Sequence, residues 1–477
     1  MRCAILQTKS AMLIEEVLQL PPAEAWETLI QKEDRTVEKD TIAAQIDPDQ
    51  HAVMNTSLRP DKAIKKYEGK DNAGKDIYRD STQSVNRIAI PIQETIVERA
   101  VGFLLGTPVE LSASPESDAE SELLNMIDRV WTKNKLDYRN RDIARTLFSE
   151  TEVAELWYVV TDESFWKEDG IVIRPKMRIL KPSDGETLLP FYDESDDMVA
   201  FSRLYSITRG EDEVEVLETY TPEWIYTFEN LKSIELISRI ANPFGKIPVV
   251  YYSQKYPDWY RVQILIERLE TLLSNFGDTN DYFGSPMIFV SGEVKGFSTK
   301  GEQGKIIQGD KGTAAEYLSW DSGPDSIKLE IDTLKDLIYT LTQTPDISFS
   351  QMKGLGNLSG VALKMMFLDA HMKAENKIEI MGEMFQRRIN LIAKICTVAN
   401  IKLEPVLKTL DIEPVFTPYL PRNEKEEMET LTTGTSKAIM SQKTAVKNNP
   451  FVQNADAEMK LIEVEAKEAA SRQTFEF

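Results

Sequence analysis

One short stretch of the chain is crowded with carboxylates: Asp193, Glu194, Asp196 and Asp197. Carboxylate oxygens are the ligands that Mg²⁺ and Mn²⁺ prefer, and an ion held there could activate water for phosphodiester cleavage. The same cluster is typical of a solvated turn between two strands, because Asp favours turns. A calcium-binding EF-hand is disfavoured, since Met198 stands where that loop requires glycine. The metal site and the plain turn both stay open.

Two glycine-containing segments have spacings close to phosphate-binding motifs. Residues 304–309 match the glycine spacing of a phosphate-binding loop, but Asp310 stands where that motif needs lysine. Residues 354–360 resemble a dinucleotide fingerprint with one residue too many between the second and third glycines. We therefore predict no nucleotide site at either segment, and we interpret the second as a loop that leads into a helix.

Imidazole and thiol groups are scarce, because the 477 residues include two histidines and two cysteines. Cys3 and Cys396 lie at opposite ends of the sequence, which argues against a disulfide framework or a paired-cysteine zinc site. His371 and Glu375 share a helix face without a third ligand, so a surface pair is predicted. No catalytic residue and no cofactor are expected, and the chain is predicted not to be an enzyme.

The composition is that of a globular protein with a strong acidic excess. Hydrophobic residues make up 42% and charged residues 28%, with 56 Lys and Arg against 78 Asp and Glu, a formal net charge of −22. Such a balance argues against general affinity for phosphate backbones, which requires clustered basic side chains. No stretch reaches the roughly 18 apolar residues that a membrane span needs, so a soluble protein of a reducing compartment is expected.

The N-terminal third of the sequence shows alternating helical and polar segments. Short helices are predicted at 14–20 and 23–31, and an exposed loop or hairpin at 56–80, around Asn72 and Gly74. From residue 85, apolar residues recur every three or four positions and predict the buried face of a helix: Ile88, Ile92, Ile96, Ala100 and Phe103. A strand is expected to start near 109–111, and another helix over 120–133.

The middle of the sequence, 152–250, is rich in short β-branched or aromatic runs separated by turn residues. Such runs predict an antiparallel sheet domain. The expected strands are 156–160, 171–173, 176–180, 199–208, 214–219 and 224–228.

Two helices of similar length are predicted after this sheet domain. The first has about 20 residues and includes Trp259 to Phe276, and the second covers about 325–343; a turn-rich insertion between them has candidate strands at 287–290 and 305–307. A polar loop, 348–360, precedes a helix predicted over 361–400, about 55–60 Å long. A last helix is expected over 455–471. The two similar helices share apolar stripes that we interpret as core or subunit interface: Trp259, Leu265, Leu269, Phe276, Ile331, Leu334 and Ile338.

Three strings stand out by their order and spacing. They are VNRIA at 85–89 with VGFLLGTPV at 101–109, NPFGKIPVV at 242–250, and LSGVALK at 358–364. They resemble the NRI…VGYLLGNPV helix, the NPFGxIPVV strand entry and the NxSGxAL helix start of tailed-phage portal proteins, in the branch typified by siphophages of Gram-positive hosts. The resemblance covers about residues 80–422.

The resemblance implies an α+β portal fold, with an α/β wing, a two-helix stem, a small β-containing clip, a long wing helix and a helical crown. On this sequence its segments would follow in chain order: a peripheral part of the wing at 1–80, the wing at 81–257, stem helices at 258–283 and 325–344 with the clip at 284–324 between them, the tunnel loop at 345–360, the long helix and wing return at 361–422, and the crown and tail at 423–477.

The same resemblance implies a ring of about a dozen copies at the unique capsid vertex, assembled in the host cytoplasm, through which double-stranded DNA is packaged and ejected. Its implied partners are the large terminase, head-completion or adaptor proteins, the major capsid and scaffold proteins, and DNA, with no membrane. DNA contacts are expected in the tunnel loop, at Lys353, Gln351 and Asn357. An acidic subunit repeated around a ring would suit a channel that passes DNA without holding it.

Two other functions remain as alternatives. The first is a metal-dependent, phosphodiester-processing enzyme that uses the acidic turn 193–197. The second is a monomeric tail or scaffold protein. Ring mass and chelator sensitivity separate these functions.

Overall fold

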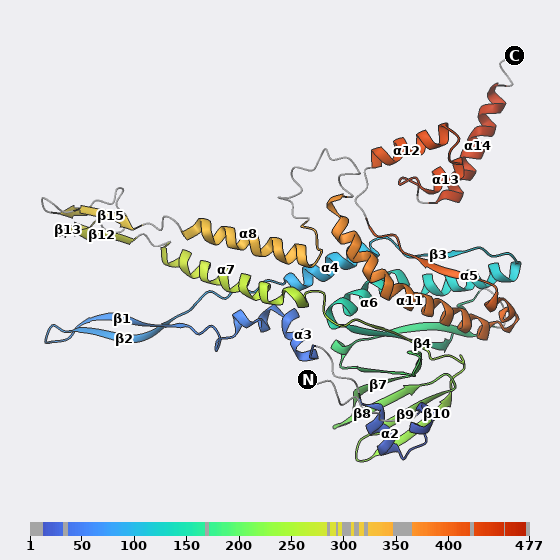
Figure 1. Cartoon of the computed structure of the whole chain (residues 1–477), viewed down its shortest axis with the longest axis horizontal. Helices are drawn as coiled ribbons and strands as arrows, with labels where there is room; N and C mark the ends of the chain where they lie inside the picture. Colours follow the sequence, from blue (N-terminus) through green and yellow to red (C-terminus); the bar gives the residue numbers. More distant parts are fainter. Residues whose placement is uncertain are drawn as a thin grey trace, which may run out of the picture.

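The computed structural model describes residues 13–31, 37–166, 171–283, 287–291, 294–297, 307–309, 314–318, 323–346, 365–419, 424–452 and 454–473. It mixes helices and sheets, so the predicted α+β class is confirmed at this level. A body of helices and two sheets carries two slender projections that extend in the same direction, a pair of long helices and a β-hairpin (Figure 1).

Two antiparallel sheets lie in the body, which confirms the sheet domain predicted over 152–250. One has the strand order β10-β9-β8-β7-β6 and the other β11-β4-β5. Their strands are β4 (Glu152–Thr161), β5 (Ile173–Leu180), β6 (Thr187–Tyr192), β7 (Met198–Arg209), β8 (Asp212–Tyr220), β9 (Trp224–Asn230), β10 (Ile234–Ala241) and β11 (Val249–Ser253). The sequence analysis missed β6 and β10, the two edge strands of the five-stranded sheet. Proline interrupts β6, and most side chains of β10 are exposed, so neither has a clear alternating pattern.

Four helices pack beside the three-stranded sheet to form the main core. They are α4 (Ile92–Leu105), α5 (Asp118–Lys133), α6 (Leu136–Glu150) and α11 (Leu368–Ala399). Helix α5 begins with a capping box, in which Ser117 and Glu120 satisfy each other's backbone N–H groups. Helix α6 was not predicted.

Helix α4 begins at Ile92, so the predicted helix over residues 85–91 is wrong. Ile88 lies in an extended segment and is 39% exposed, not part of a buried helix face. Pro91 disfavours helical backbone at the preceding residue. The backbone N–H of Ile88 instead donates to the Ser274 hydroxyl, which replaces a helical hydrogen bond.

Helix α11 has 32 residues and spans about 48 Å. It is shorter than the helix predicted over 361–400, because the helical run ends at Phe367 and restarts at Leu368; residues 361–364 lie outside the described part. Figure 1 shows this helix crossing the body from the base of the two-helix projection.

The two-helix projection consists of α7 (Gln263–Phe283) and α8 (Gly323–Leu341), which pack against each other and confirm the predicted pair. At its far end β12 (Met287–Ser291) pairs with β15 (Ala314–Leu318), and β13 (Val294–Phe297) with β14 (Ile307–Gly309). The strand predicted at 287–290 is therefore confirmed.

A second projection is the antiparallel hairpin of β1 (Lys62–Lys70) and β2 (Asp76–Gln83). Of the exposed loop or hairpin predicted at 56–80, the structure has the hairpin, which extends to residue 83. The remaining elements are α1 (Ile14–Val17), α2 (Pro22–Leu29), α3 (Lys39–Ile46), β3 (Glu110–Ala113), β16 (Ile412–Val415), α12 (Glu424–Ser436), α13 (Gln442–Lys447), α14 (Ala455–Gln473) and six 3-10 turns in the described segments. Within those segments, no helix has the length and hydropathy that a bilayer crossing requires.

Candidate functional site

The two-helix projection is joined to the body by a continuous apolar core. Trp259, Leu269, Leu334 and Ile338 are buried in the main cluster, and Leu265 and Ile331 are partly buried against it. Phe276 is partly buried farther along α7, outside that cluster. The projection is thus an extension of the body core at its base and a more exposed helix pair toward its tip.

A buried carboxylate holds the start of α7 at the base of the projection. Asp258, just before α7, lies 3.0 Å from the Lys373 ammonium and accepts a 2.6 Å hydrogen bond from the Lys377 ammonium, both from α11. Burial alone would raise the pKa of Asp258, but the two ammonium groups outweigh burial and hold that pKa below its ordinary value. An ionised Asp258 therefore links α7 to the start of α11.

An arginine holds the end of α8, also at the base of the projection. The Arg99 guanidinium of α4 donates a 2.6 Å hydrogen bond to the carbonyl of Pro345, just past α8. It also lies 5.0 Å from the ring centre of Tyr339, a cation–π distance. The start of α7 and the end of α8, both at the base of the projection, are therefore tied to the body by charged side chains.

One face of α7 binds an extended segment that runs from the β1–β2 hairpin toward α4. The backbone N–H groups of Asn86, Ile88 and Ile90 donate in turn to Asp278 at 2.7 Å, Ser274 at 2.9 Å and Glu270 at 2.8 Å. Alternate residues of the extended segment thus match successive turns of the helix, because each chain presents a group about every 6 Å. The segment is fixed along α7 by this antiparallel arrangement.

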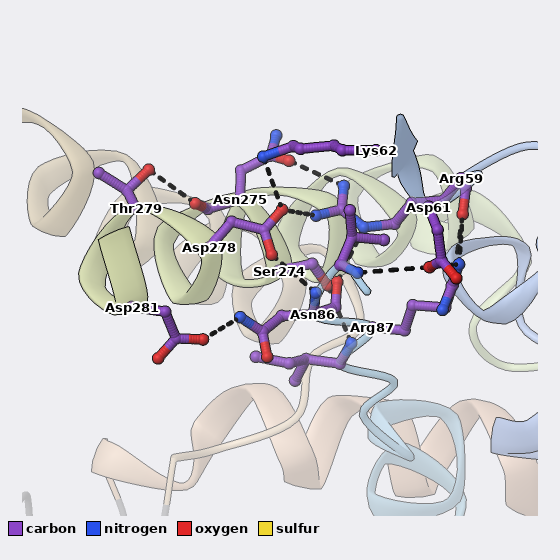
Figure 2. Close-up of polar contacts among 12 residues, drawn as sticks. Arg59, Asp61, Lys62, Asn86, Arg87, Ser274, Asn275, Asp278, Thr279 and Asp281 are labelled. Atoms are coloured by element: carbon purple, nitrogen blue, oxygen red, sulfur yellow. Dashed lines mark hydrogen bonds and ion pairs between the residues drawn. The ribbon is translucent and has the colours of Figure 1, made fainter. Parts of the chain in front are cut away.

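The base of the hairpin is tied to the same face by charges (Figure 2). The Arg59 guanidinium donates to Asp278 Oδ2 at 2.9 Å and to Asn275 Oδ1 at 2.8 Å. Lys62, the first residue of β1, lies 3.6 Å from the same Asp278 oxygen. Burial acts to raise the pKa of Asp278, but the Asn86 N–H and these two cations lower it on balance. Asp278 is therefore the centre of the hairpin's attachment.

A second carboxylate of α7, Asp281, accepts a 2.7 Å hydrogen bond from the Asn86 side chain. Gly277 is on the same face of α7, and a Cβ there would meet the Asn86 side chain at 3.2 Å. The absence of a side chain at Gly277 allows the extended segment to lie this close to the helix.

The deepest polar network of the described chain lies in the body. Arg388 of α11 donates from Nε to both Glu155 oxygens, at 3.0 and 2.9 Å, and from Nη1 to Asn140 at 2.6 Å. Tyr252 and Trp157 also donate to Glu155. Both charged side chains are fully buried. This network fixes the middle of α11 against the three-stranded sheet and α6.

The acidic stretch at 193–197 forms a turn between β6 and β7. Asp193 Oδ1 accepts the backbone N–H groups of Ser195 at 2.8 Å and Asp197 at 3.0 Å. These bonds are the usual reason for aspartate at such a turn. Across the described ranges, no group of three or more His, Cys, Asp or Glu side chains is arranged to hold a metal ion.

The other candidate residues fall in two places. His371 and Glu375 form an exposed pair 3.6 Å apart, as predicted for a surface pair. Lys353, Gln351 and Asn357 lie outside the described residues, as does all of 354–360. The predicted DNA contacts stay predictions.

The polar face of α7 was missed by sequence reasoning. Its signal is a repeat of polar and small residues on successive turns of α7, opposite the apolar stripe: Glu270, Ser274, Gly277, Asp278 and Asp281. A polar helix face normally indicates solvent. Here Glu270, Ser274 and Asp278 accept backbone N–H groups, which a search for charged pairs does not reveal.

Comparison with known proteins adds family information to this geometry. Residues 55–472 match the family model described as phage portal protein, SPP1 Gp6-like. The portal protein of Bacillus phage SPP1 is 21% identical over 436 residues, which cover 84% of this chain and 80% of that protein. A chain from a structure titled virion of native gene transfer agent particle aligns over 78% of this chain and 88% of its own length, at 9% identity and a TM-score of 0.33.

Proposed function

Since the chain belongs to the SPP1 Gp6-like family of phage portal proteins, we propose that copies of it assemble as a ring of about a dozen subunits at one capsid vertex. Double-stranded DNA passes along the axis of this ring during packaging and ejection. The ring docks the large terminase first and head-completion or adaptor proteins later, within a shell of major capsid protein built on scaffold. Its place is the virion, after assembly in the host cytoplasm.

The family match over 55–472 carries this proposal, because it spans the body, both projections and most of the C-terminal helices. In the proposed ring, α7 and α8 are the stem, the strands between them the clip, residues 345–360 the tunnel loop and α12–α14 the crown. Lys353, Gln351 and Asn357 then meet DNA transiently. The body with its sheets and α11 is the wing.

Two physical features support the proposal. The net charge of −22 per copy, repeated around a ring, repels the DNA backbone and keeps a passing polyanion from binding to the body. At its base, both chain connections of the stem are tied to body elements, through Asp258 and Arg99, so a force on the stem reaches α11 and α4 directly. Neither feature requires catalysis, and the proposed role is non-enzymatic.

The test is the mass of the purified full-length protein by light scattering, with negative-stain images of the same sample. A ring of about twelve subunits with a central hole is expected, and its mass should not change with EDTA. A small oligomer that cleaves DNA only with Mg²⁺ would overturn the portal function in favour of the enzyme alternative. A chain that stays monomeric, even with scaffold and capsid proteins present, would favour the tail or scaffold alternative.

A further inference from the structure

The β1–β2 hairpin stands free along almost its whole length. Every residue of β1 except Gly69 is exposed, and every residue of β2 except Ser81. A two-stranded hairpin with two open faces is marginal in water, so an isolated one gains stability only where another surface covers it. Figure 1 shows it beside α7 but diverging from it beyond the base.

The two faces of the hairpin differ in charge. Directly opposite residues point to the same face, and the register pairs Tyr67 with Tyr78, Lys65 with Asp80 and Lys70 with Asp76. On this first face, called the tyrosine face, each of these lysines is therefore matched by a carboxylate.

The second face, called the isoleucine face, carries two cations and two large apolar side chains: Ile64, Lys66, Ile77 and Arg79. Lys66 is directly opposite Arg79, so like charges adjoin across the strands. The acidic neighbour is Glu68 in the bulge, 3.7 Å from Arg79 on exposed side chains, a weak pair. This face is apolar and net positive, in a chain that is strongly negative overall.

Helix α8 presents a surface of complementary character. Leu334 and Ile338 are buried against the core, whereas Leu329 is 69% exposed and Leu337 is 43% exposed. With 100° per residue, Asp332 and Asp336 lie beside Leu329 on the side of the helix away from Ile338. The outward face of α8, defined by these two leucines and two aspartates, is thus apolar and negative.

The two surfaces lie on opposite sides of one stem. The hairpin is attached to the face of α7 that carries Ser274 and Asp278. Leu265 and Leu272, about half a turn away around α7, join the core cluster that contains Leu334 of α8. Figure 1 accordingly shows the hairpin, α7 and α8 in that order across the projection. A complementary pair of patches on opposite sides of a subunit makes a head-to-tail contact, and copies joined by such a contact form a ring when the rotation between them closes.

We propose that the isoleucine face of the hairpin docks on the outward face of α8 of the next copy of this chain. Lys66 and Arg79 meet Asp332 and Asp336, while the isoleucines cover the exposed leucines. The proposal rests on the proposed ring function and adds to it the identity of one subunit contact. Each stem is then held on one side by its own hairpin and on the other by its neighbour's.

The experiment exchanges charges between the two surfaces in the full-length protein. The hairpin variant carries Lys66→Glu and Arg79→Glu, and the helix variant carries Asp332→Lys and Asp336→Lys. Each alone places like charges in the contact, so the protein concentration at which half the chains are in rings should rise at least about tenfold. Mixing the two variants should restore rings. When the variants alternate around a ring, each reversed hairpin meets a reversed α8 and each native hairpin meets a native α8. Light scattering and negative stain measure both results.

The matched control is Lys65→Glu with Lys70→Glu, the same charge change on the tyrosine face, which should leave ring formation within about twofold of the native protein. Since all the substituted side chains are exposed, unchanged circular dichroism is expected throughout.

If the native protein forms rings and each variant alone forms them equally well, the hairpin contact is overturned and the proposed portal function is not. The same is true if variant rings form normally but are no longer incorporated into capsids, which would assign the isoleucine face to the shell protein. If the native protein never forms rings, the proposed function is overturned, and the proposed contact is overturned with it.

Discussion

Arg388 in α11 and Arg59 at the base of the hairpin each bind a carboxylate that is distant in sequence, Glu155 and Asp278 respectively, but in different surroundings. Arg388 and Glu155 are fully buried, whereas the side chains of Arg59 and Asp278 retain 16% and 12% exposure. Water can replace a lost partner at the Arg59–Asp278 pair but not at the buried Arg388–Glu155 pair. The same kind of ion pair is therefore costly to break in the body and less costly to break at the base of the hairpin.

Breaking the buried pair should have the largest effect. Arg388→Met leaves the Glu155 carboxylate in a dry interior with Trp157 and Tyr252 as its remaining donors, and it should lower the free energy of unfolding by about 3–5 kcal/mol. Urea unfolding followed by tryptophan fluorescence measures this. Arg387→Met, one residue away on the same helix and partly exposed, is the control and should cost under about 1 kcal/mol. Equal losses of unfolding free energy in the two variants would mean that the buried Arg388–Glu155 pair contributes no more to stability than the partly exposed Arg387.

A third carboxylate, Asp258, sharpens the comparison through pH. Its pKa is lowered in the folded protein, so its contribution to stability is fully present above its ordinary value of 3.8 and is lost as the pH falls below it. Each unit by which the pKa is lowered corresponds to about 1.4 kcal/mol. Asp258→Asn should therefore flatten the acid limb of the stability–pH curve between about pH 5 and 2. An unchanged acid limb would contradict a stabilising ion cluster of Asp258, Lys373 and Lys377 at the base of the two-helix projection.

Breaking the hairpin's attachment should have a smaller and more local effect. Asp278→Ala removes the acceptor of Arg59 and of the Asn86 N–H in a partly exposed site, which should cost about 1–2 kcal/mol. Hydrogen exchange in residues 59–90 should rise by about tenfold while exchange in α11 stays constant. Asp281→Ala, with a single contact to Asn86, is the milder comparison. A global rise in exchange would mean that the attachment belongs to the core.

The smallest effect is expected within the hairpin. The rings of Tyr67 and Tyr78 lie 5.6 Å apart, edge to face, on an exposed pair of strands. Tyr67→Ala should cost the hairpin about 0.5–1 kcal/mol and leave global unfolding unchanged. Exchange of the β1 and β2 amides reports the first, and urea unfolding the second. A shift of the urea midpoint would show that the hairpin is part of the cooperative body.

Periodicity is sufficient to predict the two-helix projection, because α7 and α8 each have one apolar stripe that must be buried. The same rule fails for α6, whose first half is mostly charged and whose stripe is correspondingly thin: Leu136, Ile143, Leu147. It also overextends α4, because Ile88 has the right spacing but its backbone bonds to a side chain of α7.

The contacts that hold the two-helix projection and the hairpin depend on partners far apart in sequence. Asn86 and Asp278 are separated by 192 residues, and Glu155 and Arg388 by 233. Composition and local pattern carry no information on such pairings, since aspartate on a helix is normally solvated. The apolar faces of α7 and α8 were therefore predictable, and the partners of the polar face of α7 were not.

The pairing of β3 with β16 joins Leu111 to Pro414 across about 300 residues. At a synthesis rate of about 5–20 residues per second, the first strand leaves the ribosome roughly 15–60 s before the second exists. During that interval β3 lacks the strand with which it pairs in the folded chain. The body is therefore complete only after residue 415 has been synthesised.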